Sequence, residues 1–87
     1  MAYFVVSYDL INNKDYQRLI DELERLSAAK MLLSQWLVEL NNTAQEVKDH
    51  LVDFVDGDDR LVVIEFDKRP AYTRMFTTGA DWIKARF

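Results

Sequence analysis

Cysteine is absent from this 87-residue chain, and histidine (His50) and proline (Pro70) occur once each. Without cysteine the chain has no disulfide framework, no thiolate metal site and no thiol nucleophile, which fits the reducing cytoplasm. A long hydrophobic run is also missing, because Ser7 and Asp9 interrupt the apolar N-terminus and no basic residues precede it. We therefore expect neither a signal peptide nor a membrane segment.

The chain is short for the amount of apolar side chain that it carries. Eighty-seven residues make one domain, and a domain of this size buries only about 60% of the surface that its unfolded chain exposes. Hydrophobic residues nevertheless make up 49% of the sequence and aromatic residues 13%. We expect the excess to be buried in a homodimer that shares a sheet or an edge.

Negative charge predominates everywhere except at the C-terminal end. Residues 1–67 contain fourteen acids and six bases, whereas residues 68–87 contain one acid and five bases, namely Lys68, Arg69, Arg74, Lys84 and Arg86. The acidic balance argues against tight non-specific binding of nucleic acid, which depends on neutralising phosphates. The basic end could contact phosphate or an acidic partner, although five charges over twenty residues are more often a solvated surface.

The N-terminal half predicts a strand, a helix and one or two further strands. Residues 3–8 are an apolar and aromatic run typical of a strand at the centre of a sheet. Asn12 and Asn13 indicate a turn, and Asp15 can cap a helix. The apolar positions of this helix recur at helical spacing: Tyr16, Leu19, Ile20, Leu23 and Leu26. Its opposite, exposed face is expected to carry Arg18, Asp21, Glu22, Glu24 and Arg25. Residues 31–40 form either one long strand or two short ones bent at Ser34 and Gln35.

The C-terminal half predicts two helices and one more strand. Thr43 and Glu46 make a capping box for a helix whose apolar face carries Ala44, Val47, Leu51, Phe54 and Val55. His50 lies on the flank of that face and is expected to be a partly exposed structural residue. The segment Asp56-Gly57-Asp58-Asp59 is expected to end the helix. We do not expect its acids to form a calcium loop, because their spacing lacks the order of such a loop. Residues 61–66 form a strand that Pro70 prevents from continuing, and a short final helix is expected to be capped by Thr77 or Thr78.

This order of elements predicts an α+β fold. Two interleaved β-α-β units in one sheet, with both helices on one face, give the ferredoxin-like split β-α-β sandwich with a C-terminal helical tail. We assign residues 1–67 to the ferredoxin-like core and residues 68–87 to a basic loop and short helix packed on the same domain. Trp36 and Trp82 could stack on bases, but both stand at apolar positions typical of a core or a dimer contact.

Three segments resemble the CRISPR-associated Cas-two superfamily. They are Val5-Val6-Ser7-Tyr8-Asp9-Leu10, Ser34-Gln35-Trp36-Leu37-Val38 and Asp58-Asp59-Arg60-Leu61-Val62-Val63. The ending Asp81-Trp82-Ile83-Lys84 is similar to that of the stand-alone SinR-like branch, in a superfamily that also includes the VapD toxins. The resemblance covers nearly the whole chain and implies a ferredoxin-like homodimer associated with RNA or DNA. The adaptation proteins of the family end in a further strand, whereas a loop and a helix are expected here, which argues against a role in spacer acquisition.

The resemblance also implies a site. The acid that closes the first strand, here Asp9, meets its two-fold mate across the dimer interface, and some members use the pair to hold a divalent metal for phosphodiester cleavage. Mg²⁺ or Mn²⁺ suits such hard oxygen ligands. Asp9 is therefore the candidate catalytic and metal-binding residue, and the candidate nucleic-acid contacts are Ser34, Lys68, Arg69, Arg74, Lys84 and Arg86. Two alternatives stay open: Asp9 can be a turn cap, and the dimer can be a non-catalytic interaction or scaffold module that retains the fold.

Overall fold

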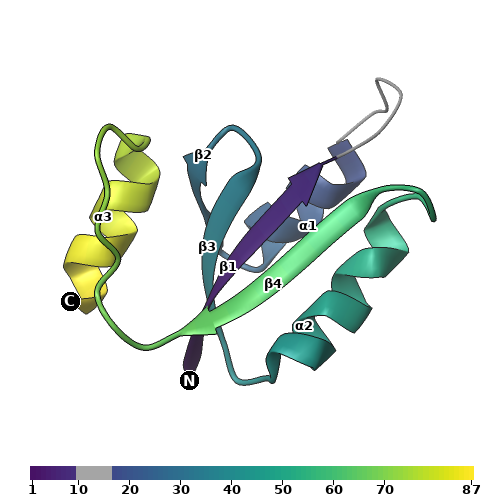
Figure 1. Ribbon diagram of the computed structural model, residues 1–87, viewed down its shortest axis with the longest axis horizontal. Coiled ribbons are helices and arrows are strands. Elements are labelled where there is room, and N and C mark those ends of the chain that lie inside the picture. The colour runs from purple at the N-terminus through teal and green to yellow at the C-terminus, as the bar shows by residue number, and fades with distance from the viewer. Residues whose placement is uncertain (10–16) are drawn as a thin grey trace.

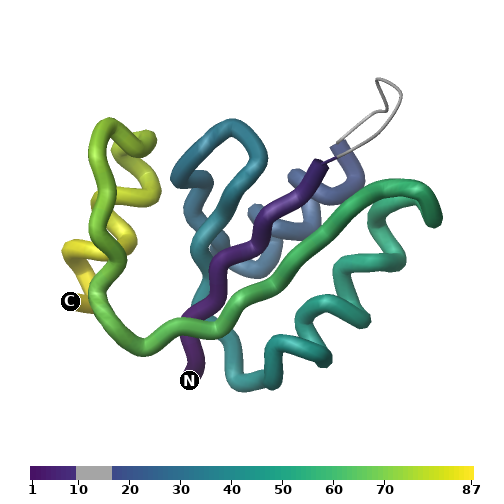
Figure 2. The backbone as a smooth tube through the Cα atoms, in the orientation of Figure 1, coloured from purple at the N-terminus to yellow at the C-terminus, as the bar shows by residue number. Residues whose placement is uncertain are grey.

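The computed structural model describes residues 1–9 and 17–87. The predicted turn at Asn12 and Asn13, the predicted cap at Asp15 and the first apolar helix position, Tyr16, lie outside the described residues. The elements follow in the order β1 (Ala2–Asp9), α1 (Gln17–Arg25), β2 (Ala29–Leu32), β3 (Gln35–Leu40), α2 (Ala44–Leu51), the 3₁₀ turn η1 (Val52–Phe54), β4 (Arg60–Phe66) and α3 (Thr77–Arg86). The predicted α+β class is confirmed, and the backbone path can be followed in Figure 2.

One four-stranded antiparallel sheet, in the order β2-β3-β1-β4, organises the molecule (Figure 1). β1 pairs with β3 over residues 2–7 and with β4 over residues 3–9, so the prediction of a central first strand is confirmed. The question left open for residues 31–40 is decided in favour of two strands. β2 and β3 are joined by a turn at Leu33 and Ser34, and β2 begins two residues before the predicted run, at Ala29.

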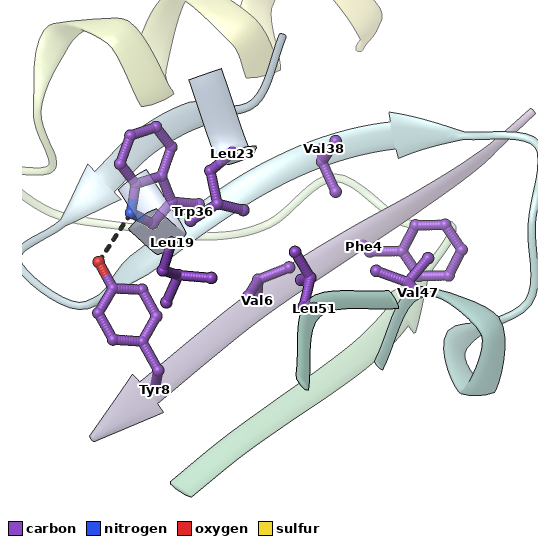
Figure 3. Packing of buried hydrophobic residues seen from close by; sticks show 9 residues of the cluster. All are labelled: Phe4, Val6, Tyr8, Leu19, Leu23, Trp36, Val38, Val47 and Leu51. Atoms are coloured by element: carbon purple, nitrogen blue, oxygen red, sulfur yellow. Dashed lines mark hydrogen bonds between the residues drawn. The ribbon is translucent and has the colours of Figure 1, made fainter. Parts of the chain in front are cut away.

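The main core lies between one face of the sheet and the two helices α1 and α2. Alternate residues of β1 point to opposite faces, and those at positions 4, 6 and 8 face the helices. The buried cluster combines side chains from all these elements: Phe4, Val6, Tyr8, Leu19, Leu23, Trp36, Val38, Val47 and Leu51 (Figure 3). The indole Nε1 of Trp36 donates to the hydroxyl of Tyr8 at 3.0 Å, so the one polar pair drawn in this core is satisfied.

α3 packs on the opposite face of the sheet, where it covers β2 and one end of β1 and β4. Trp82 and Ile83 are buried against Met31 and Leu37, and the rings of Tyr3 and Phe66 pack on Trp82. Both tryptophans are therefore core residues, with exposed fractions of only 4% for Trp36 and 6% for Trp82. None of the helices among residues 1–9 and 17–87 is both long and apolar enough to cross a membrane.

The two predicted helix starts that lie within the described residues have different outcomes. The capping box of α2 is confirmed: Thr43 Oγ1 accepts from the backbone N–H of Glu46, and the Glu46 carboxylate accepts from that of Thr43. The prediction of a threonine cap for α3 is wrong, because Phe76 occupies the N-cap position without a side-chain hydrogen bond. Thr78 instead donates to the carbonyl of Lys30 at 2.7 Å. The hydroxyl is thus used to attach the helix to the edge of β2.

Candidate functional site

Asp9 is the last residue of β1 and shares a sheet face with residues 3, 5 and 7, on the side away from α1 and α2. Its side chain is 67% exposed. Arg60, its register partner on β4, donates from Nη1 to Asp9 Oδ2 at 3.1 Å. The carboxylate therefore has an exposed cation beside it, and a metal ion that used Asp9 would share this carboxylate with Arg60. Because both side chains are exposed, water screens the attraction between them, and Arg60 holds Asp9 only weakly.

Ser34 lies close to this end of β1. Its carbonyl accepts a hydrogen bond from the backbone N–H of Tyr8 at 3.1 Å, which fixes the β2–β3 turn one residue from Asp9. The Ser34 side chain is exposed. A small cavity of about 110 Å³ beside the strand end is lined by Ser7, Tyr8, Asp9, Arg60, Leu61 and Val62. The strand end thus offers one carboxylate and one guanidinium, with a serine hydroxyl in the neighbouring turn.

The five basic residues predicted to contact nucleic acid do not gather around Asp9. Lys68 and Arg69 follow the opposite end of β4, which lies six residues, or about 20 Å of strand, from Arg60. Arg74 belongs to the segment before α3, and Lys84 is exposed in the last turn of that helix. The side chain of Arg86 is used inside the fold, since it pairs with Glu39 at 2.9 Å and lies over the Trp82 ring. A compact basic patch at Asp9 is therefore not formed within the described residues.

An exposed apolar surface adjoins the Asp9 end of the sheet. Val62 and Ile64 of β4 are each 53% exposed, and they lie opposite Ser7 and Val5 of β1 in the sheet register. We call Val5, Val62 and Ile64 the apolar sheet face. It continues into a groove of about 270 Å³ that the segment before α3 forms over Val5, Met31 and Leu37. α3 packs on the same side of the sheet but over β2 and the other end of β1 and β4. Asp9 and the apolar sheet face therefore lie on the part of this side that α3 leaves open.

The acidic turn before β4 brings three carboxylates together. One oxygen from each of Asp56, Asp58 and Asp59 lies within 4.8 Å of the others, a spacing at which a cation could bind. The turn also uses these residues internally, because Asp59 Oδ2 accepts from the backbone N–H of Asp56 at 2.8 Å and the backbone N–H of Asp59 donates to the Asp56 carbonyl. These hydrogen bonds give the Asp59 carboxylate a role in closing the turn after the α2–η1 segment, where the sequence predicts that the helix ends.

One cluster was missed by the sequence prediction, which placed Glu22 on the exposed face of its helix. Glu22 is in fact only 6% exposed. Its carboxylate accepts from Nε and Nη2 of Arg25 at 2.7 and 2.5 Å, and from Nε2 of His50 on α2 at 2.5 Å. The hydrogen bonds from Arg25 lower the pKa of Glu22 to about 2; burial opposes this shift, and the hydrogen bond from His50 assists it. At neutral pH the carboxylate is ionised and can only accept, so His50 Nε2 carries the hydrogen.

The sequence spacing of Glu22 and His50 from buried residues of their own helices gave a partial indication of this cluster. Glu22 stands three residues after Leu19, and His50 three residues after Val47, so each lies beside a buried position of its own helix. A carboxylate and an imidazole at such flanking positions can meet when the two helices pack side by side. Sequence alone does not say which flanks face each other, so the pairing appears only in the folded chain.

No protein-family model matches the chain, and no solved structure matches it.

Proposed function

We propose that the protein is a nucleic-acid-associated homodimer of the Cas-two type, in which the two Asp9 carboxylates form a metal-dependent site that cleaves a phosphodiester. The observation that carries the proposal is the position of Asp9 on the same open sheet face as Val62 and Ile64. A second copy that covered this face would bury the exposed apolar side chains and would draw Asp9 towards its mate.

Two features of the fold support the family assignment. The strand order β2-β3-β1-β4, with α1 between β1 and β2 and α2 between β3 and β4, supports the proposal of a ferredoxin-like split β-α-β sheet. α1 and α2 both pack on one face, which leaves the other face for α3 and for a partner. The lack of cysteine supports a cytoplasmic setting for such a dimer.

Symmetry sets a strict condition on the dimer. In a two-fold interface each residue near the axis meets its own copy. Val5 and Asp9 are four residues apart on one strand, or about 13 Å. The two carboxylates therefore pair only if the axis passes near the Asp9 end of the apolar sheet face rather than near its centre.

The donor set fits a hard divalent cation only when two subunits combine. Asp9 of each subunit would hold Mg²⁺ or Mn²⁺, which supplies Lewis-acid activation of water and of the scissile phosphate when it is bound. Arg60 offers a planar guanidinium suited to a phosphate oxygen, and its weak hold on Asp9 leaves it available for that contact. Ser34, in the turn beside the strand end, adds a hydroxyl that can donate to the nucleic-acid backbone.

A second candidate function, a non-catalytic dimeric interaction or scaffold module, is favoured by the ion pair between Asp9 and Arg60. In this alternative the pairing of Arg60 with Asp9 has no catalytic role and only joins the ends of β1 and β4. The scattered positions of Lys68, Arg69, Arg74, Lys84 and Arg86 also suit a protein that does not concentrate nucleic acid at one site.

The dimer is tested first, by sedimentation equilibrium of the full chain. Ile64→Lys places a charge in the apolar sheet face and is expected to give a monomer, because burying a lysine there is costly. Val52→Lys is the matched control, since Val52 is 41% exposed but lies at the end of α2, away from that face. A monomeric wild-type protein, or a dimer unaffected by Ile64→Lys, would contradict the proposed interface.

Cleavage is tested with the same dimer on RNA and DNA substrates, with Mg²⁺, with Mn²⁺ and with a chelator. Asp9→Asn keeps the size of the side chain and removes its charge, so it is expected to abolish metal-dependent cleavage without changing the dimer. Asp67→Asn, at an exposed aspartate just beyond β4, is the control and is expected to retain activity. Cleavage that survives Asp9→Asn would show that the site lies elsewhere.

The scaffold alternative makes its own prediction. If the dimer lacks nuclease activity, its binding to duplex DNA should weaken steeply as salt is raised, because such binding depends on phosphate contacts. Lys68→Gln combined with Arg69→Gln should reduce the steepness of this dependence. If the dimer does not bind DNA even at low salt, the hypothesis of a nucleic-acid scaffold is excluded. The hypothesis of a module that binds another protein then remains.

A further inference from the structure

The cluster of Glu22, Arg25 and His50 borders a cavity on the helical side of the molecule, on the face of the sheet opposite to Asp9. The cavity has a volume of about 250 Å³ and is lined by Arg25, Leu26, Leu40, Asn42, Val47 and His50. It lies where the end of α1 meets α2 and the end of β3. Its wall is therefore built from three elements and combines aliphatic and polar side chains.

Glu22 holds the polar wall in place. The Arg25 guanidinium uses Nε and Nη2 on Glu22, which leaves its Nη1 without an acceptor among the described residues. His50 uses Nε2 on the same carboxylate, and its Nδ1 makes no hydrogen bond with the described residues. Because Glu22 is almost fully buried and already satisfied, it orients both neighbours without itself needing a further partner. The arrangement is typical of a carboxylate that supports a binding site rather than one that contacts the ligand.

We infer that this cavity is a binding site for a small organic carboxylate. The carboxylate of the ligand accepts from Arg25 Nη1 and from the side-chain amide of Asn42. The aliphatic tail of the ligand packs on Leu26, Leu40 and Val47. The cavity volume of about 250 Å³ is sufficient for a short aliphatic chain.

A carboxylate suits the site better than a cation or a neutral alcohol. Glu22 is not among the residues that line the cavity, and its charge is paired with Arg25, so the one permanently charged group that a ligand meets there among the described residues is the Arg25 guanidinium. A cationic ligand would be repelled by the Arg25 guanidinium, and no carboxylate among the described residues lines the cavity to pair with it. A neutral alcohol would fill the aliphatic part but would forgo the charge-assisted hydrogen bond from Arg25.

Butyrate is the test ligand, with butanol and butylammonium as probes of the same length and different charge. Titration of the ¹⁵N-labelled full chain should give saturable NMR shifts at residues 25–26, 40–42 and 47–50 with butyrate. Butanol and butylammonium should give weaker or no shifts at these positions. Equal shifts for butyrate and butanol, or shifts that do not saturate with butyrate, would overturn the inference.

Three variants locate the charge requirement. Arg25→Gln should weaken butyrate binding by about tenfold or more, which corresponds to the loss of one charge-assisted hydrogen bond. Because Arg25→Gln also loosens Glu22, Asn42→Asp is the second test: Asn42 is exposed and precedes the capping residue of α2, so an added negative charge there repels the ligand without disturbing the core. Arg18→Gln, an exposed arginine of α1 that bonds the Asp53 carbonyl, is the control and should bind butyrate like the wild type. Undiminished binding by both Arg25→Gln and Asn42→Asp would refute the site, whatever the outcome at Asp9.

Discussion

In the wild-type protein, the free energy of unfolding is expected to fall as Glu22 becomes protonated at acid pH. The Glu22→Gln substitution should remove this part of the pH dependence. Hydrogen bonds from Arg25 hold the pKa of Glu22 at about 2, compared with an ordinary value of 4.5; burial opposes this shift, and the hydrogen bond from His50 assists it. Because the pKa is lower in the folded state than in the unfolded state, the carboxylate contributes its full stabilisation above pH 4.5. That contribution is lost as the pH falls from 4.5 towards about 2.

The structure sets the size of this effect. A pKa difference between 4.5 and about 2 gives an upper bound of about 3 kcal/mol, at roughly 1.4 kcal/mol for each pH unit. The two partners are partly in water, with side-chain exposures of 65% for Arg25 and 46% for His50, and water screens their attraction for Glu22. We therefore expect the measured contribution to be about 1–2 kcal/mol.

Urea unfolding followed by circular dichroism, repeated from neutral pH down towards pH 2, measures this contribution. The free energy of unfolding of the wild type should exceed that of Glu22→Gln at neutral pH, and the two should converge at the acid end. Glu24→Gln is the control, because Glu24 is an exposed carboxylate two residues away on the same helix, and this variant should follow the wild type throughout. A constant gap between wild type and Glu22→Gln across the whole pH range would refute the reasoning.

Two further pairs of substitutions test the packing of α3 on the sheet and the capping of the helices. Gly79→Ala should destabilise the protein by about 1–3 kcal/mol in urea unfolding, because a Cβ at this position would lie 2.6 Å from the Cβ of Met31 and would push α3 off β2. Gly57→Ala, where a Cβ meets nothing within 4 Å, should change stability little; equal effects of the two substitutions would contradict the packing argument. Thr43→Ala should cost about 0.5–2 kcal/mol of unfolding free energy through loss of the capping box, whereas Thr77→Ala should cost less in the same assay, because Thr77 does not cap α3. A larger loss at Thr77 than at Thr43 would reverse this assignment.

Several elements were predictable because their signals are local. The apolar run of β1 and the capping box at Thr43 depend on residues a few positions apart, and both appear as predicted. The start of α3 was mispredicted because a competing interaction is long-range: the Thr78 hydroxyl bonds the Lys30 carbonyl, and the Phe76 backbone N–H bonds the Met31 carbonyl. Local capping preference was overridden by pairing with a strand far away in the sequence.

The candidate site was predictable only in part for the same reason. Asp9 could be selected because it closes a strand, but the sequence did not indicate that Arg60 pairs with it, since that depends on the β1–β4 register. The basic residues could be counted in the sequence, yet their distribution over β4 and α3 separates them from Asp9.

The sequence by itself determined the strand near the N-terminus, the capped start of α2 and the strand before Pro70, because hydrophobic periodicity and capping act within a few residues. It also determined the absence of thiol chemistry, which composition alone decides. Only the tertiary structure decided which side chains meet: Glu22 turned from an expected surface residue into the buried link between α1 and α2, and Asp9 came to share an open sheet face with Val62 and Ile64. These outcomes depend on how helices pack and how strands align, and a one-residue change in strand register would have sent Asp9 to the opposite face.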